Sequence, residues 1–234
     1  MFQPVRIAPS ILSADFMNLG HDIAMIEQAG AGYVHFDVMD GHFVPNLTIG
    51  VPVLKQLKKI ANIPVDVHLM ISNPLEQLPW FLAAGADIVT VHAEALEGEG
   101  QMQQAIDMIK EAGAKACISV KPKTPVDVLQ PVLSQLDMVL VMSVEPGFSG
   151  QKYIQGSDAK VARVVEMARA CGNDDLLIEV DGGVGVGTAA LVAAAGADVL
   201  VCGNAVFAAD DPAAALKQVQ ALADQARLEA LGKA

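Results

Sequence analysis

The sequence predicts a single (βα)8 barrel of the α/β class over residues 1–234, and three observations support this prediction. Short apolar runs rich in Val and Ile alternate with helical patterns, which is typical of a parallel sheet covered by helices. The tripeptide Ala-Gly-Ala recurs at spacings close to two, one and three multiples of a unit of about 28 residues. Eight such units fill the 234 residues without an inserted second domain, so a closed barrel is favoured over an open doubly wound sheet.

The expected strands are short, and a helical pattern follows each of them. In chain order they cover residues 7–11, 33–38, 65–70, 88–92, 116–120, 138–143, 177–181 and 199–202. A glycine of Ala-Gly-Ala is the expected C-cap wherever a helix gives way to a strand, because glycine adopts the left-handed conformation without strain. These glycines are Gly30, Gly85, Gly113 and Gly196. The segments NPLEQLPW and KPKTP mark turns, and residues 212–231 are the expected eighth helix.

The charge balance argues against partners that are polyanions. With 15 Lys and Arg against 27 Asp and Glu, the formal net charge of −12 disfavours binding to nucleic acid or to an anionic membrane. Any bound phosphate must therefore be held by local contacts. The cysteines Cys117, Cys171 and Cys202 lie far apart and predict neither a disulfide framework nor a zinc ribbon, which fits a reducing cytosol.

No targeting signal or membrane span is expected. The start, MFQPVRIAPS, lacks the basic and then apolar stretch of a signal peptide, so a cytoplasmic location is predicted. Residues 189–209 are strongly apolar, but Gly196, Asp198, Gly203 and Asn204 interrupt the run where a helix should turn into a strand. A buried helix and strand explain this segment better than a transmembrane helix does.

Four polar residues interrupt apolar strands. His35 and Asp37 lie in YVHFDVMDG, His68 in VDVHLM, and Asp181 at the end of IEVD. A buried ionisable group is costly unless it is paired or bound to metal, and two imidazoles with two carboxylates form a mixed nitrogen and oxygen cage for a divalent ion. Singly, each histidine could be a hydrogen-bonded core residue and Asp181 a turn-forming residue. Together, on strands that face one mouth of a barrel, they favour a metal site.

Glycine-rich segments follow the last three expected strands. EPGFSGQ follows the sixth strand, and pairs containing glycine follow the seventh and eighth. Each alone is usually a turn, but this end of such barrels often binds phosphate through backbone amide groups. We therefore expect a phosphate grip made by Gly147, Phe148, Ser149, Gly150, Gly182, Gly183, Gly203 and Asn204.

Three methionines stand at strand ends near the same mouth: Met39, Met70 and Met142. Methionine is usually an adaptable filler of cores. The alternative is that they form a water-excluding, polarisable cap over a planar intermediate. His92 and Glu179 are interpreted as structural, and residues 40–46, DGHFVPN, as a rim or lid.

The segments APSILSADF, HFDVMDGHFVPN, VHLM, VMSVEPGFSGQ and IEVDGGV occur here in the order of the ribulose-phosphate 3-epimerase family, which the chain resembles over residues 7–207. The resemblance implies a TIM barrel of the ribulose-phosphate binding type that interconverts D-ribulose 5-phosphate and D-xylulose 5-phosphate. These substrates indicate the pentose phosphate pathway or a carbon-fixation cycle. The resemblance also implies that His35, Asp37, His68 and Asp181 hold one divalent metal ion, that Ser10 and His68 contact the substrate, and that the protein is a homo-oligomer.

The chemistry of such a reaction agrees with the residues. Inverting a carbon beside a ketone requires removal of a proton from one face and delivery of one to the other, so two acid/base groups are needed on opposite sides. Asp37 and Asp181 are the candidates, with roles that exchange with the direction of reaction. The cis-enediolate between the two steps carries oxyanions that a metal ion can stabilise. The ligand types suit Zn²⁺, Fe²⁺, Mn²⁺ or Co²⁺ equally.

Three other functions stay open. An epimerase of a six-carbon ketose phosphate, such as allulose 6-phosphate, would use the same metal and carboxylates. A barrel that decarboxylates or condenses sugar phosphates would need a lysine beside Asp37, and a non-catalytic sugar-phosphate sensor would not need both aspartates and both histidines. Ser149, Asn204 and Lys121 depart from the commonest family pattern, and the first two leave the geometry around the phosphate open.

Overall fold

The computed structural model describes residues 3–232, so the outermost two residues at each end of the expected domain lie outside the described part. Eight parallel strands form one sheet in the order β1-β8-β7-β6-β5-β4-β3-β2. The strands are β1 (Arg6–Pro9), β2 (Val34–Met39), β3 (Val65–Met70), β4 (Ile88–His92), β5 (Lys115–Val120), β6 (Met138–Met142), β7 (Leu177–Asp181) and β8 (Val199–Cys202). A parallel bridge between Ser10 and His35 brings the two ends of the sheet together. The predicted barrel is confirmed.

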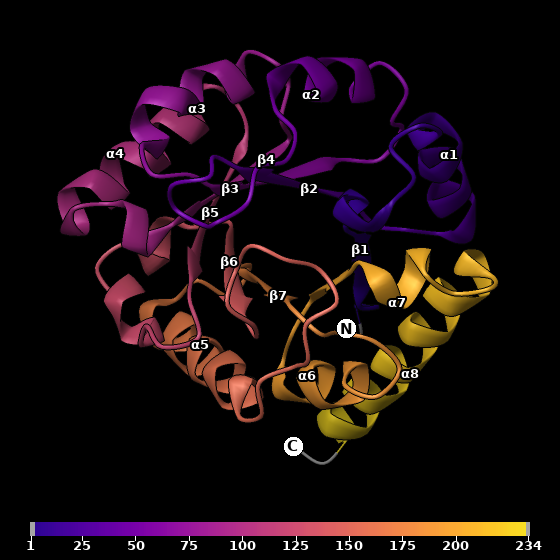
Figure 1. The fold of residues 1–234 in the computed structure, drawn as a ribbon. Helices are drawn as coiled ribbons and strands as arrows, with labels where there is room; N and C mark the ends of the chain where they lie inside the picture. The colour runs from indigo at the N-terminus through magenta and orange to yellow at the C-terminus, as the bar shows by residue number, and fades with distance from the viewer. Residues whose placement is uncertain (1–2, 233–234) are drawn as a thin grey trace.

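The helices form a ring around the strands (Figure 1). They are α1 (Leu19–Ala29), α2 (Val51–Leu57), α3 (Pro74–Leu82), α4 (Gly98–Glu111), α5 (Ser157–Cys171), α6 (Ala189–Ala195), α7 (Asn204–Phe207) and α8 (Pro212–Gly232). Gly30 and Gly196 adopt φ of 98° and 116° as the C-caps of α1 and α6, as the Ala-Gly-Ala repeats predicted. Residues 189–209 fold as α6, β8 and α7, and within residues 3–232 no helix has both the length and the apolar character to cross a membrane.

The strict alternation of strand and α-helix fails at one connection. Between β5 and β6 the described chain contains only the short 3-10 helices η3 (Val126–Leu129) and η4 (Leu133–Gln135). This segment carries Pro122, Pro125 and Pro131. Proline lacks the amide hydrogen of an α-helix and clashes with the preceding turn, so closely spaced prolines prevent a regular helix here.

Side chains of the strands form two layers. Outward-facing residues such as Phe36, Val67 and Val180 are buried against the helices, and each such side chain contributes about 1.5–3 kcal/mol of transfer free energy. Inward-facing Ala8, Cys117 and several neighbours fill part of the barrel interior with apolar groups. Consecutive strand residues point to opposite faces, so every second residue faces inward. Many of the other inward positions hold polar side chains. These are His35, Asp37, Asp66, His68, Thr90, His92, Ser119 and Glu179, all buried.

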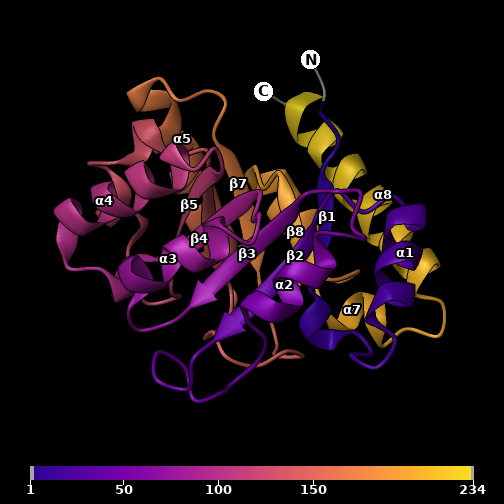
Figure 2. The same cartoon turned by 90° about the horizontal axis from the view of Figure 1, so that it is seen from above.

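The carboxyl ends of the strands define one mouth of the barrel. Figure 2 shows the arrowheads of β2 and β3 pointing away from the C-terminal end of α8, towards long connecting loops. In barrels of this type the loops at this end carry the functional groups. The predicted site residues belong to this end.

Candidate active site

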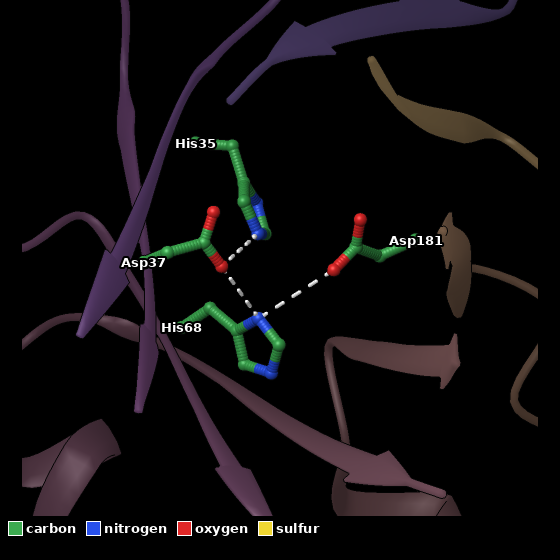
Figure 3. Close-up of side chains that lie close together, drawn as sticks. All are labelled: His35, Asp37, His68 and Asp181. Carbon is green, nitrogen blue, oxygen red and sulfur yellow. Dashed lines mark hydrogen bonds and ion pairs between the residues drawn. The ribbon is translucent and has the colours of Figure 1, made fainter. Parts of the chain in front are cut away.

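Four side chains at the mouth point towards a common centre (Figure 3). Asp37 Oδ1 lies 3.4 Å from His35 Nε2 and 3.1 Å from His68 Nδ1. Asp181 Oδ2 lies 3.8 Å from the same nitrogen of His68. One ligand atom from each of the four residues lies within 4.8 Å of all the others. This spacing and this donor set can hold a metal ion.

Strand register explains the convergence. In the β2–β3 pair, His35 lies opposite Asp66 and Asp37 opposite His68, so neighbouring inward positions stack imidazole beside carboxylate. Asp181 ends β7 opposite Met142 of β6, and closure of the barrel carries it to the same centre. Sequence spacing alone relates residues within a strand, whereas the parallel register relates residues on different strands.

One ring nitrogen of His35 faces the centre without a hydrogen-bond partner within residues 3–232. Its Nδ1 lies 2.6 Å from Asp66 Oδ2, and among the described residues its buried Nε2 has no hydrogen-bond partner. A carboxylate behind a histidine is a common way to fix the ring and raise its basicity as a metal ligand. Burial disfavours a charged ring, but the charges of Asp37 and Asp66 outweigh burial and raise the pKa of His35 well above its ordinary value. The orphaned nitrogen fits a cation at this position.

The two aspartates have opposite electrostatic environments. Burial would raise the pKa of Asp37, but the neighbouring imidazoles of His35 and His68 outweigh it and hold the pKa below its usual range. Burial, together with the negative charge of Asp37, raises the pKa of Asp181 to about 6. Two interacting carboxyl groups with separated pKa values can serve as one base and one acid.

Ser10 links the first strand to this centre. It follows β1, and its hydroxyl donates a 2.5 Å hydrogen bond to Asp37 Oδ2. Because the Ser10–His35 bridge also joins the ends of the sheet, closure of the barrel places this hydroxyl beside the carboxylate. Ser10 is 5% exposed and belongs to the wall of the cavity described next.

A cavity of about 430 Å³ opens above the four side chains. Its volume lies within the ordinary range for small-molecule sites. His35 and His68 have no exposed surface and do not line this cavity themselves. The other predicted site residues line it: Ser10, Asp37, Met39, Met70, Met142, Gly147, Phe148, Ser149, Gly150, Asp181, Gly182, Gly183, Gly203 and Asn204.

The glycines allow the loops after β6, β7 and β8 to pack closely. Gly183 has φ of +64°, and a Cβ added there would lie 2.3 Å from the backbone nitrogen of Tyr153. A Cβ added at Gly150 would lie 2.6 Å from Asn204 Nδ2. Ser13 donates a 2.8 Å hydrogen bond to Asn204 Oδ1, which orients that amide group. Three loops thus enclose one side of the cavity.

Residues 40–46, the segment predicted as a rim or lid, follow β2. The carboxylate of Asp40 accepts hydrogen bonds from the amides of His42, Phe43 and Ser72. Asn46 Nδ2 donates a 2.8 Å hydrogen bond to the carbonyl oxygen of Gly147, which ties the rim to the loop after β6. Beneath it, Met39 and Met70 pack with Leu12, Phe43 and Val44. The two methionines therefore belong to an apolar layer that also faces the cavity.

Comparison with known proteins identifies the family of this chain. The model of the ribulose-phosphate 3 epimerase family matches residues 6–207. The chain belongs to the ribulose-phosphate 3-epimerase family. A ribulose-phosphate 3-epimerase of Bacillus subtilis is 48% identical over 92% of this chain and 98% of its own length. The enzyme of that name from Mycobacterium tuberculosis is 48% identical over 95% and 94% of the two chains.

Two further comparisons concern a plant relative and a solved structure. A chloroplastic ribulose-5-phosphate-3-epimerase of Arabidopsis thaliana is 45% identical over 93% of this chain and 76% of its own. Among solved structures, a 3-hexulose-6-phosphate synthase superposes with a TM-score of 0.66 at 20% identity, covering 94% of this chain and 99% of the other. The second likeness concerns the fold alone. Membership in the ribulose-phosphate 3-epimerase family confirms the predicted resemblance and the predicted class of enzyme.

The sequence interpretation of His92 and Glu179 as structural did not anticipate two of their contacts in this member of the ribulose-phosphate 3-epimerase family. His92 Nε2 lies 2.8 Å from His68 Nε2, and Glu179 Oε1 lies 3.7 Å from His35 Nδ1. Both contact a predicted metal ligand. The sequence does contain a signal for these contacts. Each of the two residues is ionisable and lies at an inward position of an apolar strand, as His35 and His68 do.

Proposed function

We propose that this protein is a metal-dependent 3-epimerase that interconverts D-ribulose 5-phosphate and D-xylulose 5-phosphate. Asp37 and Asp181 exchange the proton on carbon 3, and the reaction passes through a cis-enediolate. The observation that carries the proposal is the approach of these two carboxyl groups from β2 and β7 to one centre at the floor of the cavity.

The two aspartates supply the proton transfers. For a ketose bound between them, the ionised carboxylate removes the proton from carbon 3 on its own face, and the protonated partner donates a proton to the opposite face. The environments described above make Asp37 the more readily ionised partner and Asp181 the more readily protonated one. The reverse reaction exchanges these roles. The hydrogen bond from Ser10 holds the Asp37 carboxylate in place.

The ligand set suits one divalent cation. His35, Asp37, His68 and Asp181 would hold it, and it would supply Lewis-acid stabilisation of the oxyanion charge that develops when the proton on carbon 3 is removed. Two imidazole nitrogens and two carboxylate oxygens suit Zn²⁺, Fe²⁺, Mn²⁺ or Co²⁺.

The rest of the cavity suits a short sugar phosphate. We assign the phosphate to the side enclosed by Gly183, Gly203 and Asn204, where three loops meet. Asn204 offers its Nδ2 hydrogens, because its Oδ1 already accepts from Ser13. The side chains of Met39, Met70 and Met142 border the reacting carbons on the apolar side and exclude water from the enediolate.

Three expectations from the sequence complete the proposal. The chain forms one catalytic domain over residues 1–234, acts in the cytoplasm within the pentose phosphate pathway, and assembles as a homo-oligomer. Light scattering of the purified protein measures the last of these, and a monomer at micromolar concentration would contradict it.

The test is a coupled assay of metal-reconstituted protein with D-ribulose 5-phosphate and, separately, D-allulose 6-phosphate. Asp37→Asn, Asp181→Asn and a chelated sample are measured beside the wild type. Removal of one partner of an acid/base pair is expected to lower kcat by about 10²–10⁴-fold. Asp175→Asn is the matched control, because Asp175 is exposed and lies at the opposite end of β7 from Asp181.

The outcomes separate the candidate functions. Formation of xylulose 5-phosphate that is lost in both aspartate variants and after chelation, but not in the control, supports the proposal. Turnover of the six-carbon phosphate alone keeps the mechanism and changes the substrate. Absence of both activities while metal and phosphate still bind would leave a sugar-phosphate sensor as the better explanation.

A further inference from the structure

We infer that His92 and Glu94 are positioning residues that set the tautomer of His68, so that its Nδ1 is the bare nitrogen facing Asp37 and Asp181. The inference deepens the proposed function, because it concerns one ligand of the proposed metal centre. It rests on a chain of hydrogen bonds that begins at the surface and ends at the centre.

The chain joins three side chains and one backbone amide. His68 Nε2 lies 2.8 Å from His92 Nε2, and His92 Nδ1 lies 3.2 Å from Glu94 Oε2. The other oxygen of Glu94 accepts a 2.7 Å hydrogen bond from the amide of Lys121. Both imidazoles are fully buried, whereas the Glu94 side chain is 21% exposed. Glu94 is therefore the entry to an otherwise enclosed chain.

Hydrogen-bond chemistry gives this chain one direction. An ionised carboxylate only accepts hydrogen bonds, so His92 carries its proton on Nδ1. A neutral imidazole carries one proton, so a His92 ring protonated on Nδ1 offers its Nε2 as an acceptor. His68 must then donate from Nε2, which leaves Nδ1 with a free lone pair. That nitrogen is the one 3.1 Å from Asp37 and 3.8 Å from Asp181.

The surroundings hold both rings in this geometry. The His68 and His92 rings stack with centroids 5.0 Å apart, and Phe43 of the rim lies 4.8 Å from the His92 centroid. Burial would raise the pKa of Glu94, but hydrogen bonds from His92, Thr124 and the Lys121 amide outweigh it and lower the pKa to about 2. Glu94 is thus ionised throughout the neutral range and always an acceptor.

Glu94→Gln tests the direction of the chain. The Lys121 amide still requires an acceptor, so it retains the oxygen of the glutamine, and the NH₂ group faces His92 Nδ1. His92 must then carry its proton on Nε2 and donate to His68, which places the His68 proton on Nδ1, inside the proposed metal centre. Loss of such an outer partner typically weakens metal binding about 10–100-fold.

Two further variants separate this effect from a loss of structure. Glu94→Ala removes the acceptor without introducing a donor, so the chain can keep its direction and the loss of metal affinity is expected to be smaller than in Glu94→Gln. A merely structural role of Glu94 predicts the opposite order. Glu97→Gln makes the same change of charge at an exposed position of the same segment and is expected to bind metal like the wild type.

The measurements are Co²⁺ affinity, from its visible absorption in the full-length protein, and histidine tautomers, from long-range ¹H–¹⁵N spectra of Zn²⁺-loaded and metal-free samples. The protein has only 5 histidines, which keeps these spectra simple. We expect His92 to be protonated on Nδ1 in the wild type and on Nε2 in Glu94→Gln, with Co²⁺ affinity at least 10-fold lower. Thermal unfolding verifies that each variant is folded.

Each outcome decides one claim. Unchanged Co²⁺ affinity in Glu94→Gln, or a larger loss in Glu94→Ala than in Glu94→Gln, overturns the positioning role. A wild-type His92 protonated on Nε2 overturns the direction of the chain. Failure of the wild type to bind Co²⁺ overturns the proposed metal centre itself, whereas loss of epimerase activity with intact Co²⁺ binding concerns the proposed reaction alone.

Discussion

Gly183→Ala should damage both the fold and the phosphate side of the cavity. Gly183 has φ of +64°, and a Cβ there would lie 2.3 Å from the backbone nitrogen of Tyr153, 2.8 Å from its Cα and 2.9 Å from the carbonyl oxygen of Gln151. All three are backbone atoms, so no side-chain rotation relieves the contact. To restore an ordinary 3.4 Å separation, the loop after β6 must move by about 1 Å.

The magnitude follows from two contributions. A left-handed backbone costs alanine roughly 1–2 kcal/mol, and overpacking typically costs about 1–3 kcal/mol. The expected loss of about 2–5 kcal/mol lowers the Tm of a chain of this size by roughly 4–20 °C. A displacement of about 1 Å in a substrate-positioning loop also lowers kcat/KM about 100-fold. Denaturant unfolding and the epimerase assay measure the two effects.

The matched control is Gly100→Ala. Gly100 lies in α4, and a Cβ there meets nothing within 4 Å. This variant is expected to keep full activity and the same or slightly higher stability, because alanine favours a helix more than glycine does. If Gly183→Ala has the stability and kcat/KM of the wild type, the close packing of the loops after β6 and β7 does not govern the cavity.

Three further outcomes are expected. Asp40→Asn should raise KM several-fold, and it should also remove a contribution to stability that depends on pH. Burial would raise the pKa of Asp40, but hydrogen bonds outweigh burial and lower the pKa to about 2. The ionised carboxylate therefore stabilises the fold above the ordinary pKa of an aspartate, and this stabilisation is lost as pH falls towards 2. Acid titration of the two proteins compares this loss. Metal binding should release a proton from His35, whose pKa is raised, and should weaken as pH falls; calorimetry in buffers of different ionisation enthalpy measures the release, and affinity independent of pH would contradict it. Burial raises the pKa of Glu179 well above its ordinary 4.5, so wild-type stability falls by up to about 1.4 kcal/mol per pH unit as pH rises above 4.5. Glu179→Gln should abolish this slope, and an unchanged slope in urea unfolding would refute the assignment.

Much of the fold was predictable because its signals are local. The apolar runs located all eight strands to within about two residues, which is the usual uncertainty of such boundaries. The connection between β5 and β6 was predicted less well. Its prolines were recognised as turn formers near Pro122 and Pro125, but their combined effect on the whole segment up to η4 was not.

The candidate site was predictable in its residues and not in its contacts. His35, Asp37, His68 and Asp181 stood out because an ionisable residue is costly in an apolar strand. No local sequence pattern relates His68 to His92. His92 lies on the next strand and contacts His68 Nε2, whereas Asp37 lies beside His68 Nδ1.

The sequence by itself determined the repeating unit, the strands and the polar residues at their inward positions, because these depend on composition and on the alternation of side chains within one strand. Only the tertiary structure decided which atoms meet. Parallel register set His35 beside Asp66, and closure of the barrel brought Asp181 within 3.8 Å of His68. Such contacts join residues far apart in the chain, so they depend on how the whole sheet twists and closes and on no single segment.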